Sequence, residues 1–312
     1  MRRFLAALVT FAALITVPAL ALTEEEMDAA AVECAREAIT VCVSEDMTEL
    51  ETLTALHDWL ALHCDYGATL RGETAYGALV EGTGNCVGYA EGYACLAAEA
   101  GLSGRCTYSE ELDHAWILTE LDGSTYFSDC TWDDGKNQKL GMIRHTYLLF
   151  DESSAVSVGH YGWDSVERVP GGFLEAVPWR TAVTRVIFDG AYAYYIDRGF
   201  RLCRCDRSTW ATETLASSDA RWPAEESGRE ELYTGLIMVR RRLYFNTPDA
   251  ICYYDMDRDE VKTVLRLHTP DRFVYGIAEK NGTLRFSLAE SAAALDYDLR
   301  DTGISLRGAW GY

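Results

Sequence analysis

The spacing of apolar and polar residues predicts helices early in the chain. Thr23 precedes three glutamates and a run of small and apolar residues, which is typical of a helix start. Thr48 with Glu51 forms a capping box ahead of a second amphipathic run. A third run, 87–100, is rich in small and apolar residues and ends at Gly101, a residue suited to the left-handed position after a helix.

The pattern then changes to strands. The runs 104–110, 114–121 and 124–132 are rich in strand-forming residues. The last two are separated only by Asp122 and Gly123, and an Asp-Gly link between such runs is a strong hairpin signal. Helices followed by antiparallel strands are an α+β pattern.

After residues 170–172 the chain consists of strands and turns with almost no helical period. Three segments share a turn, a strand with aromatic residues, a second turn and a strand that ends in Asp: 189–206, 240–257 and 280–298. Their spacing of roughly 40 to 50 residues is in the range of a propeller blade, although a closed ring usually needs about four blades or more. We therefore predict a separate all-β domain of propeller-like repeats at 181–312, after a linker at 173–180.

The first residues have the pattern of a secretory signal. Residues 1–21 combine two arginines, an apolar run and the small-x-small ending Ala19-Leu20-Ala21. The apolar run is broken by Pro18 and is shorter than the ~20 residues that span a bilayer. We expect a cleaved signal peptide, a secreted mature protein and no membrane attachment after cleavage.

Charge and cysteine content limit the classes of partner. The chain has 49 acidic and 28 basic residues, a net charge of −21, which opposes binding to nucleic acid or to an anionic membrane. Its ten cysteines lack the tight, even spacing of a small disulfide scaffold. Neither His57 with His63 nor Cys203 with Cys205 has the spacing of a zinc site. We expect no metal and no organic cofactor.

Candidate chemistry lies where the third helix begins. Cys86 stands there, and the unpaired amides of a helix start lower the pKa of a thiol. Ideal hairpin register pairs Trp116 with Asp129, so Asp129 lies on the same face as His114, as its diagonal neighbour. Asp133 is the other diagonal neighbour if the strand continues that far. An imidazole oriented by a carboxylate can activate a thiol.

These segments resemble a known family. The stretches GNCVGYAEGYACLAAEAGL and DHAWILTELDGSTYFSDCTWDD are similar to the core of the transglutaminase-like, papain-type superfamily, and flanking segments extend the resemblance over about 50–165. Together with the signal pattern, the resemblance suggests a bacterial secreted member, and we assign the catalytic domain to 22–172. It places the nucleophile on Cys86, the base on His114 and the orienting acid on Asp129 in preference to Asp133.

The resemblance predicts a cysteine enzyme that acts on peptide or carboxamide bonds through a thioester. Many bacterial members resemble hydrolases, so protease-like or amidase-like hydrolysis is favoured over transamidation. The expected substrate is a protein or peptide, such as a cell-surface or cell-wall peptide. The alternative is a catalytically idle scaffold whose β repeats bind a surface ligand, as in an adhesion protein. The sequence sets no oligomeric state.

The remaining histidines give no comparable signal. His145, His160 and His268 have no carboxylate partner at a recognisable spacing. His160 lies in the segment GHYGW, which can line a site in a folded chain, and we assign it no catalytic role. Cys203 and Cys252 occupy equivalent places in two repeats, which indicates shared packing or a bridge between neighbouring strands.

Overall fold

The computed structural model describes most of the chain after the predicted signal segment. The described residues are 22–135, 138–164, 168–170, 176–224, 231–280, 282–295 and 302–305. The predicted signal peptide, 1–21, lies outside them. Within these ranges, no helix combines the length and the apolar character that a membrane crossing requires.

The first part of the described chain is helical, as predicted. Its long helices are α1 (Glu24–Cys42), α2 (Glu49–His63) and α3 (Cys86–Glu99). Thr23 and Thr48 each form a complete capping box, and Asn85 caps α3. Gly101 has a φ of +78°, which confirms its predicted left-handed position. Shorter elements are β1 (Asp65–Tyr66), η1 (Gly77–Glu81), β2 (Thr83–Gly84), α4 (Cys130–Asp133), η2 (Gln138–Leu140), α5 (Glu152–Ala155), η3 (Val156–Val158), η5 (Pro178–Thr181) and η6 (Ala292–Ala294).

An antiparallel sheet follows the helices. It contains β3 (Gly104–Ser109), β4 (His114–Leu121) and β5 (Ser124–Ser128) in the order β3-β4-β5. The hairpin between β4 and β5 has the predicted register, with Leu118 opposite Phe127.

The predicted pairing does not extend to Asp129, and this part of the prediction was wrong. Strand β5 ends at Ser128, so the pair of Trp116 with Asp129 does not form. Asp129 instead caps α4, because its carboxylate accepts the backbone N–H of Trp132 at 3.1 Å. Local side-chain acceptors of this kind compete with strand pairing.

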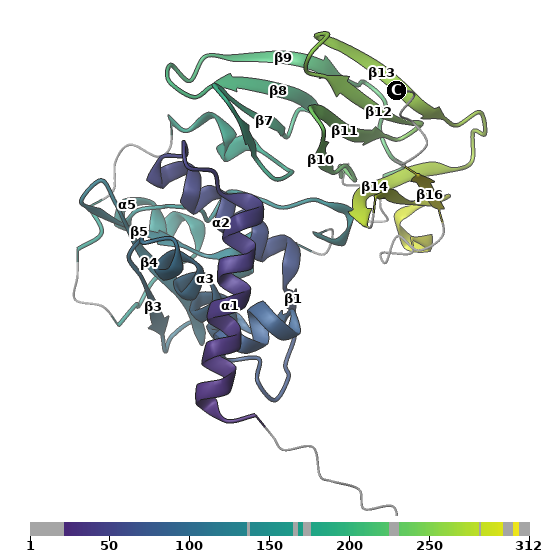
Figure 1. Ribbon diagram of the computed structural model, residues 1–312. Coiled ribbons are helices and arrows are strands. Elements are labelled where there is room, and N and C mark those ends of the chain that lie inside the picture. The colour runs from purple at the N-terminus through teal and green to yellow at the C-terminus, as the bar shows by residue number, and fades with distance from the viewer. Residues whose placement is uncertain are drawn as a thin grey trace, which may run out of the picture.

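Helix α3 occupies the centre of this part. It packs against α1 on one side and against β3 and β4 on the other, as Figure 1 shows. Its buried side chains include Tyr89, Tyr93 and Leu96. At its first turn Gly88 lies so close to the loop before η1 that an added Cβ would be 2.1 Å from the carbonyl oxygen of Gly72. The start of α3 is therefore fixed by tight backbone contact.

The C-terminal β region, residues 187–305, consists of three antiparallel sheets in its described part, each built from consecutive strands. The first contains β6 (Ile187–Asp189), β7 (Tyr192–Ile196), β8 (Arg201–Asp206) and β9 (Thr212–Ser217). The second contains β10 (Leu236–Val239), β11 (Arg242–Thr247), β12 (Ala250–Asp255) and β13 (Glu260–Arg266). The third contains β14 (Phe273–Lys280), β15 (Thr283–Ala289) and β16 (Thr302–Ser305).

Two of the three predicted repeats have the expected structure. Repeats 189–206 and 240–257 each contain two adjacent antiparallel strands. In the third repeat β15 pairs instead with β16, beyond the predicted segment. Residues 292–294 of that segment form a turn of 3-10 helix, and 296–300 lie outside the described residues.

The helical part and the first β sheet share one hydrophobic cluster. It includes Leu56 of α2 and Tyr93 of α3 together with Phe188 and Tyr195 of the first sheet. Trp179, from the predicted linker, is buried in the same cluster, and its indole N–H donates to Thr54 at 3.3 Å. In Figure 1 the strands β7 to β13 lie above the helices, and β14 and β16 lie to the right of the upper helices. The core therefore runs across the predicted boundary at residue 181.

Candidate active site

Cys86 is the first residue of α3, one residue earlier than the predicted helix start. The side-chain oxygen of Asn85 accepts hydrogen bonds from the backbone N–H groups of Val87 and Gly88 at 3.1 and 3.2 Å. It thereby caps the first turn of α3, where Cys86 lies. The sulfur lies in a small cluster with Ala90 and Ala115, and 8% of the cysteine is exposed. Cys86 is thus mostly buried and keeps a small solvent-exposed fraction.

His114 lies between Cys86 and Asp129. Its Nε2 is 2.7 Å from Oδ2 of Asp129, and its ring also forms a hydrogen bond with the Cys86 thiol. Since an ionised carboxylate only accepts, Nε2 carries the proton toward Asp129 and Nδ1 is left for the sulfur. The structure therefore brings together the three side chains that the resemblance selected.

Two indoles fix the plane of the His114 ring. Trp132 of α4 stacks on it with ring centroids 4.9 Å apart and an interplanar angle of 20°. Trp116 lies at 5.8 Å and 29°, two residues further along β4. Both indoles lie nearly parallel to the imidazole, and Asp129 holds its Nε2, so the ring has little freedom to turn away from the sulfur.

Electrostatics distinguish Cys86 from the other cysteines. Burial raises the pKa of the Cys86 thiol, but hydrogen bonds from His114 and from the backbone of Ala115 and Val87 outweigh it, so the pKa is lowered. The pKa of each of the other nine cysteines is raised, mainly by burial. All ten are free thiols. Of the two alternatives for Cys203 and Cys252, the structure agrees with packing, because both thiols are free and each is buried in a core cluster.

The pKa of the His114 imidazole is about 9. Burial alone would lower this pKa from its usual 6.5, but the hydrogen bonds to Asp129 and Cys86 raise it by more than burial lowers it. At neutral pH the arrangement therefore favours a thiolate beside an imidazolium, which is the reactive pair of cysteine nucleophiles.

Asp129 is held by donors on both carboxylate oxygens. Oδ1 accepts from the Trp132 backbone, and Oδ2 accepts from both His114 and His160. Its own backbone N–H donates to the carbonyl of Tyr147 at 2.8 Å. Burial raises the pKa of Asp129, but the hydrogen bonds from the two histidines lower it by more than burial raises it. Asp129 therefore remains ionised near neutral pH.

Asp133, the alternative that the sequence left open, serves a different histidine. Its carboxylate accepts the backbone N–H groups of Thr146 and Tyr147, each at 2.9 Å, and lies 3.2 Å from Nε2 of His57. It belongs to the opposite end of α4. The structure thus assigns Asp129 to His114 by geometry as well as by resemblance.

The sequence showed no carboxylate partner for His145 or His160, and the structure gives one to each. His145 Nε2 lies 2.8 Å from Oδ1 of Asp58, and His57 Nδ1 lies 3.0 Å from the same oxygen. His160 shares Asp129 with His114. These partners come from distant parts of the chain, so no short spacing could reveal them. The one local signal is the GHYGW turn, where Gly159 has a φ of +93°.

Two groups of buried side chains have the composition of a metal site. They are His57 with Asp58 and His145, and His114 with Asp129 and His160. In both, each nitrogen lies 2.7–3.0 Å from one carboxylate oxygen, which are ordinary hydrogen-bond lengths. His57 is also flanked by Asp133, and two carboxylates favour a doubly protonated ring over a metal ligand.

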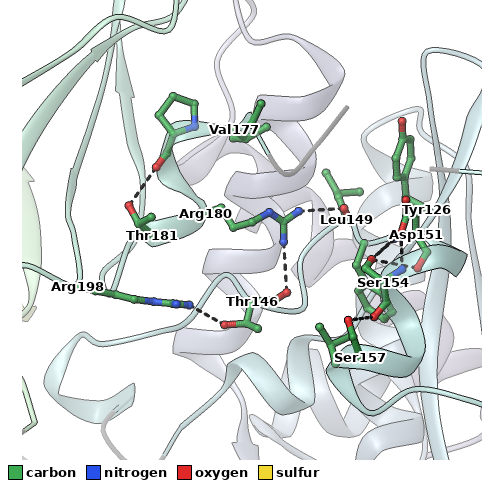
Figure 2. A pocket seen from close by; sticks show the side chains of 14 residues that line it. Tyr126, Thr146, Leu149, Asp151, Ser154, Ser157, Val177, Arg180, Thr181 and Arg198 are labelled. Carbon is green, nitrogen blue, oxygen red and sulfur yellow. Dashed lines mark hydrogen bonds between the residues drawn. The ribbon is translucent and has the colours of Figure 1, made fainter. Parts of the chain in front are cut away.

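A cavity of about 530 Å³ lies beside the loop that precedes α5. Figure 2 shows Arg180 reaching across it to the carbonyl oxygens of Thr146 and Leu149, at 3.2 and 3.1 Å. Arg198 donates to the Thr146 hydroxyl at 2.9 Å. The lining residues do not include Cys86. Arg180 therefore holds the loop whose Tyr147 carbonyl accepts the Asp129 N–H.

Part of the chain matches a known family model. Residues 37–132 match the family model described as the Transglutaminase-like superfamily. No curated protein sequence matches the chain. The range contains the thiol, the imidazole and the carboxylate described above.

Several solved structures show weak similarity. A TGase aligns over 37% of this chain and 35% of its own, at 17% identity and a TM-score of 0.29. A proposed cysteine protease from Cytophaga hutchinsonii aligns over 37% and 45%, at 19% identity and 0.29. The N-terminal domain of Nup159 aligns over 55% and 35%, at 14% identity and 0.26. The chain thus spans less than half the length of each, and scores this low do not establish a shared fold.

Proposed function

Because residues 37–132 belong to the transglutaminase-like superfamily, we propose that the protein is a cysteine enzyme that acts on peptide or carboxamide bonds through a thioester on Cys86. One observation carries this proposal: Cys86, at a helix start, is the cysteine whose pKa is lowered, and it is hydrogen-bonded to a histidine that Asp129 orients.

The geometry supports a two-step reaction. The Cys86 thiolate attacks the carbonyl carbon, the C–S bond forms, and the C–N bond breaks as the His114 imidazolium gives its proton to the leaving amine. His114, now neutral, then accepts a proton from water as the oxygen of that water attacks the thioester. The C–S bond breaks, the product leaves as an acid, and the thiolate is restored. Asp129 keeps the His114 ring in one tautomer throughout.

Hydrolysis is the proposed second step, in preference to transfer to an amine. The resemblance to bacterial hydrolases supports this choice, and no cofactor is required by the steps above. The proposed substrate is a protein or peptide outside the cell, such as a cell-wall peptide. The signal-like pattern of 1–21 and its Ala19-Leu20-Ala21 ending support secretion.

The C-terminal β region is proposed to form a second, propeller-like unit spanning about 181–312. The successive antiparallel sheets of consecutive strands support this proposal. Its first sheet shares a hydrophobic cluster with α2 and α3, and we propose that the region positions or restricts a substrate without supplying chemistry.

A trapped intermediate tests the proposed function. The full-length protein is incubated with a peptide library, quenched in acid and mapped by mass spectrometry. We expect an acyl adduct on Cys86 that hydroxylamine removes, as for a thioester. Cys86→Ser should abolish this adduct, and Cys95→Ala should leave it unchanged, because the pKa of Cys95 is raised to about 11.

The same experiment determines whether water or an amine accepts the acyl group in the second step. In water labelled with oxygen-18, hydrolysis adds one labelled oxygen to the product acid, whereas transfer to an added amine yields an unlabelled amide. An adduct confined to other cysteines, or no adduct with any peptide, would favour the idle scaffold instead.

A further inference from the structure

His160 is a second imidazole on the Asp129 carboxylate. Its Nε2 lies 2.9 Å from Oδ2 of Asp129, the oxygen that also lies 2.7 Å from Nε2 of His114. The His160 side chain is fully buried, and Asp129 is 1% exposed. Because an ionised carboxylate can only accept, His160 must direct an N–H from Nε2 at this oxygen.

Aromatic rings surround the His160 ring. The centroid distances are 4.3 Å to Trp132, 4.7 Å to Phe150, 4.9 Å to Trp116, 5.5 Å to Tyr147 and 5.9 Å to His114. Its other nitrogen, Nδ1, has no hydrogen-bond partner among the described residues. Among the described residues, the polar contact of this side chain is therefore with Asp129 alone.

The backbone delivers His160 to this position. The His160 N–H donates to the carbonyl of Ala155 at 2.8 Å, which closes the turn after η3. Gly159, with a φ of +93°, packs so closely on Trp132 that an added Cβ would lie 3.1 Å from the indole. Both contacts fix the ring relative to α4, where Asp129 is the cap.

We propose that His160 is a positioning residue, whose Nε2–H holds Oδ2 of Asp129 where that oxygen orients His114 toward Cys86. This inference rests on the proposed function, because it assigns a role within the same site. His160 does not touch the substrate or the sulfur in this role. It acts through Asp129.

Loss of the His160 donor has a defined electrostatic effect. Hydrogen bonds to the charged form of a carboxylate favour that form, and the bonds from His114 and His160 together outweigh burial in setting the lowered pKa of Asp129. Without His160 this pKa rises. Asp129 then becomes neutral at a higher pH, and His114 loses its charged partner there. The acid limb of Cys86 reactivity should move to higher pH.

Two variants separate the hydrogen bond from packing. His160→Phe keeps a flat ring among its aromatic neighbours but has no donor. His160→Gln places an amide N–H at a similar distance from the backbone as Nε2. The second-order rate of Cys86 alkylation by iodoacetamide is measured on the full chain by mass spectrometry from pH 4 to 9.

We expect His160→Phe to slow alkylation roughly tenfold or more near pH 5 and to shift the acid limb upward, as for loss of a hydrogen bond to a charged group. His160→Gln should recover most of the rate and the limb. Equal profiles for wild type and His160→Phe would overturn the inference. So would a slower His160→Gln beside an unchanged His160→Phe, which indicates packing alone.

A measurement on the wild-type chain covers the case in which a variant fails to fold. Histidine side-chain nitrogen NMR should show His160 protonated at Nε2, and protonation at Nδ1 instead would contradict the inference. A wild-type Cys86 that reacts no faster than Cys95 would overturn the proposed function, whereas a fast Cys86 with an insensitive His160 would overturn this inference alone.

Discussion

The environment of one sulfur sets Cys86 apart from nine similar thiols. Burial raises the pKa of all of them, but at Cys86 the helix start and the His114 ring reverse the outcome. Both contributions come from residues distant from each other in sequence, 28 positions apart by their numbers. The chemistry therefore depends on the hairpin returning His114 to the start of α3.

Asp129→Asn tests how far the charge of Asp129 maintains the imidazolium. The amide keeps the shape but not the charge, so the pKa of His114 should fall from about 9 toward its usual 6.5. Acyl transfer needs a protonated His114 to assist the leaving amine, so its descending alkaline limb should move from near pH 9 to lower pH. The measurement is the pH dependence of product formation from an adduct-forming peptide.

The control for this change is Asp113→Asn. Asp113 lies beside His114 in sequence, but its carboxylate accepts from the Tyr108 hydroxyl at 2.5 Å and is exposed. It should leave the alkaline limb in place. A limb that stays near pH 9 in Asp129→Asn would show that another group sets the pKa of His114.

At this scale the sequence predicted some of the side-chain contacts in the site and missed others. Parity along the hairpin placed Asp129 near His114, and the register holds as far as Ser128. It could not predict the contact of His160, because that residue lies 31 positions after Asp129 and reaches it only through the tertiary fold. Nor could it predict that Asp129 would cap a helix rather than continue a strand.

At the scale of elements, the start of α3 depends on backbone contact. Asn85 caps the helix, and its own N–H donates to the Gly72 carbonyl at 2.9 Å. Gly88, one turn later, lies in close contact with the same carbonyl. The loop before η1 and the first turn of α3 thus form one rigid support for Cys86.

Gly88→Ala should disturb this support. Its methyl group would lie 2.1 Å from the Gly72 oxygen, so the backbone must shift. We expect a loss of about 1–3 kcal/mol in the free energy of unfolding, the usual cost of overpacking, and slower labelling of Cys86. Chemical denaturation and mass spectrometry measure the two effects.

Gly135→Ala is the matched control. A methyl group there would lie 4.0 Å from Arg144, the nearest atom, so it should change the free energy of unfolding by no more than about 0.5 kcal/mol. If Gly88→Ala were as mild as this control, the close contact at the start of α3 would be wrong.

The elements themselves were largely predictable. Capping boxes and the Asp-Gly turn are local, so Thr23, Thr48 and the β4–β5 hairpin have the predicted structure. The third β repeat was not predictable in the same way, because β15 pairs with a strand beyond the segment that resembled its neighbours.

At the scale of the whole molecule, a buried polar network joins the helices to the C-terminal β region. Asp58 of α2 accepts from His145, from His57 and, at 2.7 Å, from the backbone N–H of Val186, just before β6. His145 Nδ1 lies 3.3 Å from the Ala182 carbonyl. Such long-range contacts, like the shared hydrophobic cluster, leave no periodic trace in the sequence.

This network makes stability depend on pH. Burial would lower the pKa of His57, but Asp133 and Asp58 raise it to about 9, above its usual 6.5. Its stabilising contribution is therefore complete below pH 6.5 and is lost as the pH rises through 9. The pKa of Asp58 is lowered to about 2 by its two histidines against the effect of burial, so its contribution is present above pH 3.8 and is lost as the pH falls through 2.

We expect the free energy of unfolding to fall between pH 6.5 and 9, partly through His57 and partly through His114. His57→Gln should reduce this slope, as measured by denaturation at several pH values. His63→Gln, also on α2, should not, because burial lowers the pKa of His63, the opposite direction from His57. An unchanged slope in His57→Gln would show that His57 does not contribute to the pH dependence of the free energy of unfolding.

The most direct test of the proposed mechanism is the rate at which iodoacetamide labels Cys86 in the purified protein near neutral pH. We predict that Cys86 reacts well ahead of Cys95 and that His114→Ala slows it while leaving Cys95 unchanged. Equal, slow labelling of both cysteines, with no effect of His114→Ala, would contradict an activated thiolate at the start of α3.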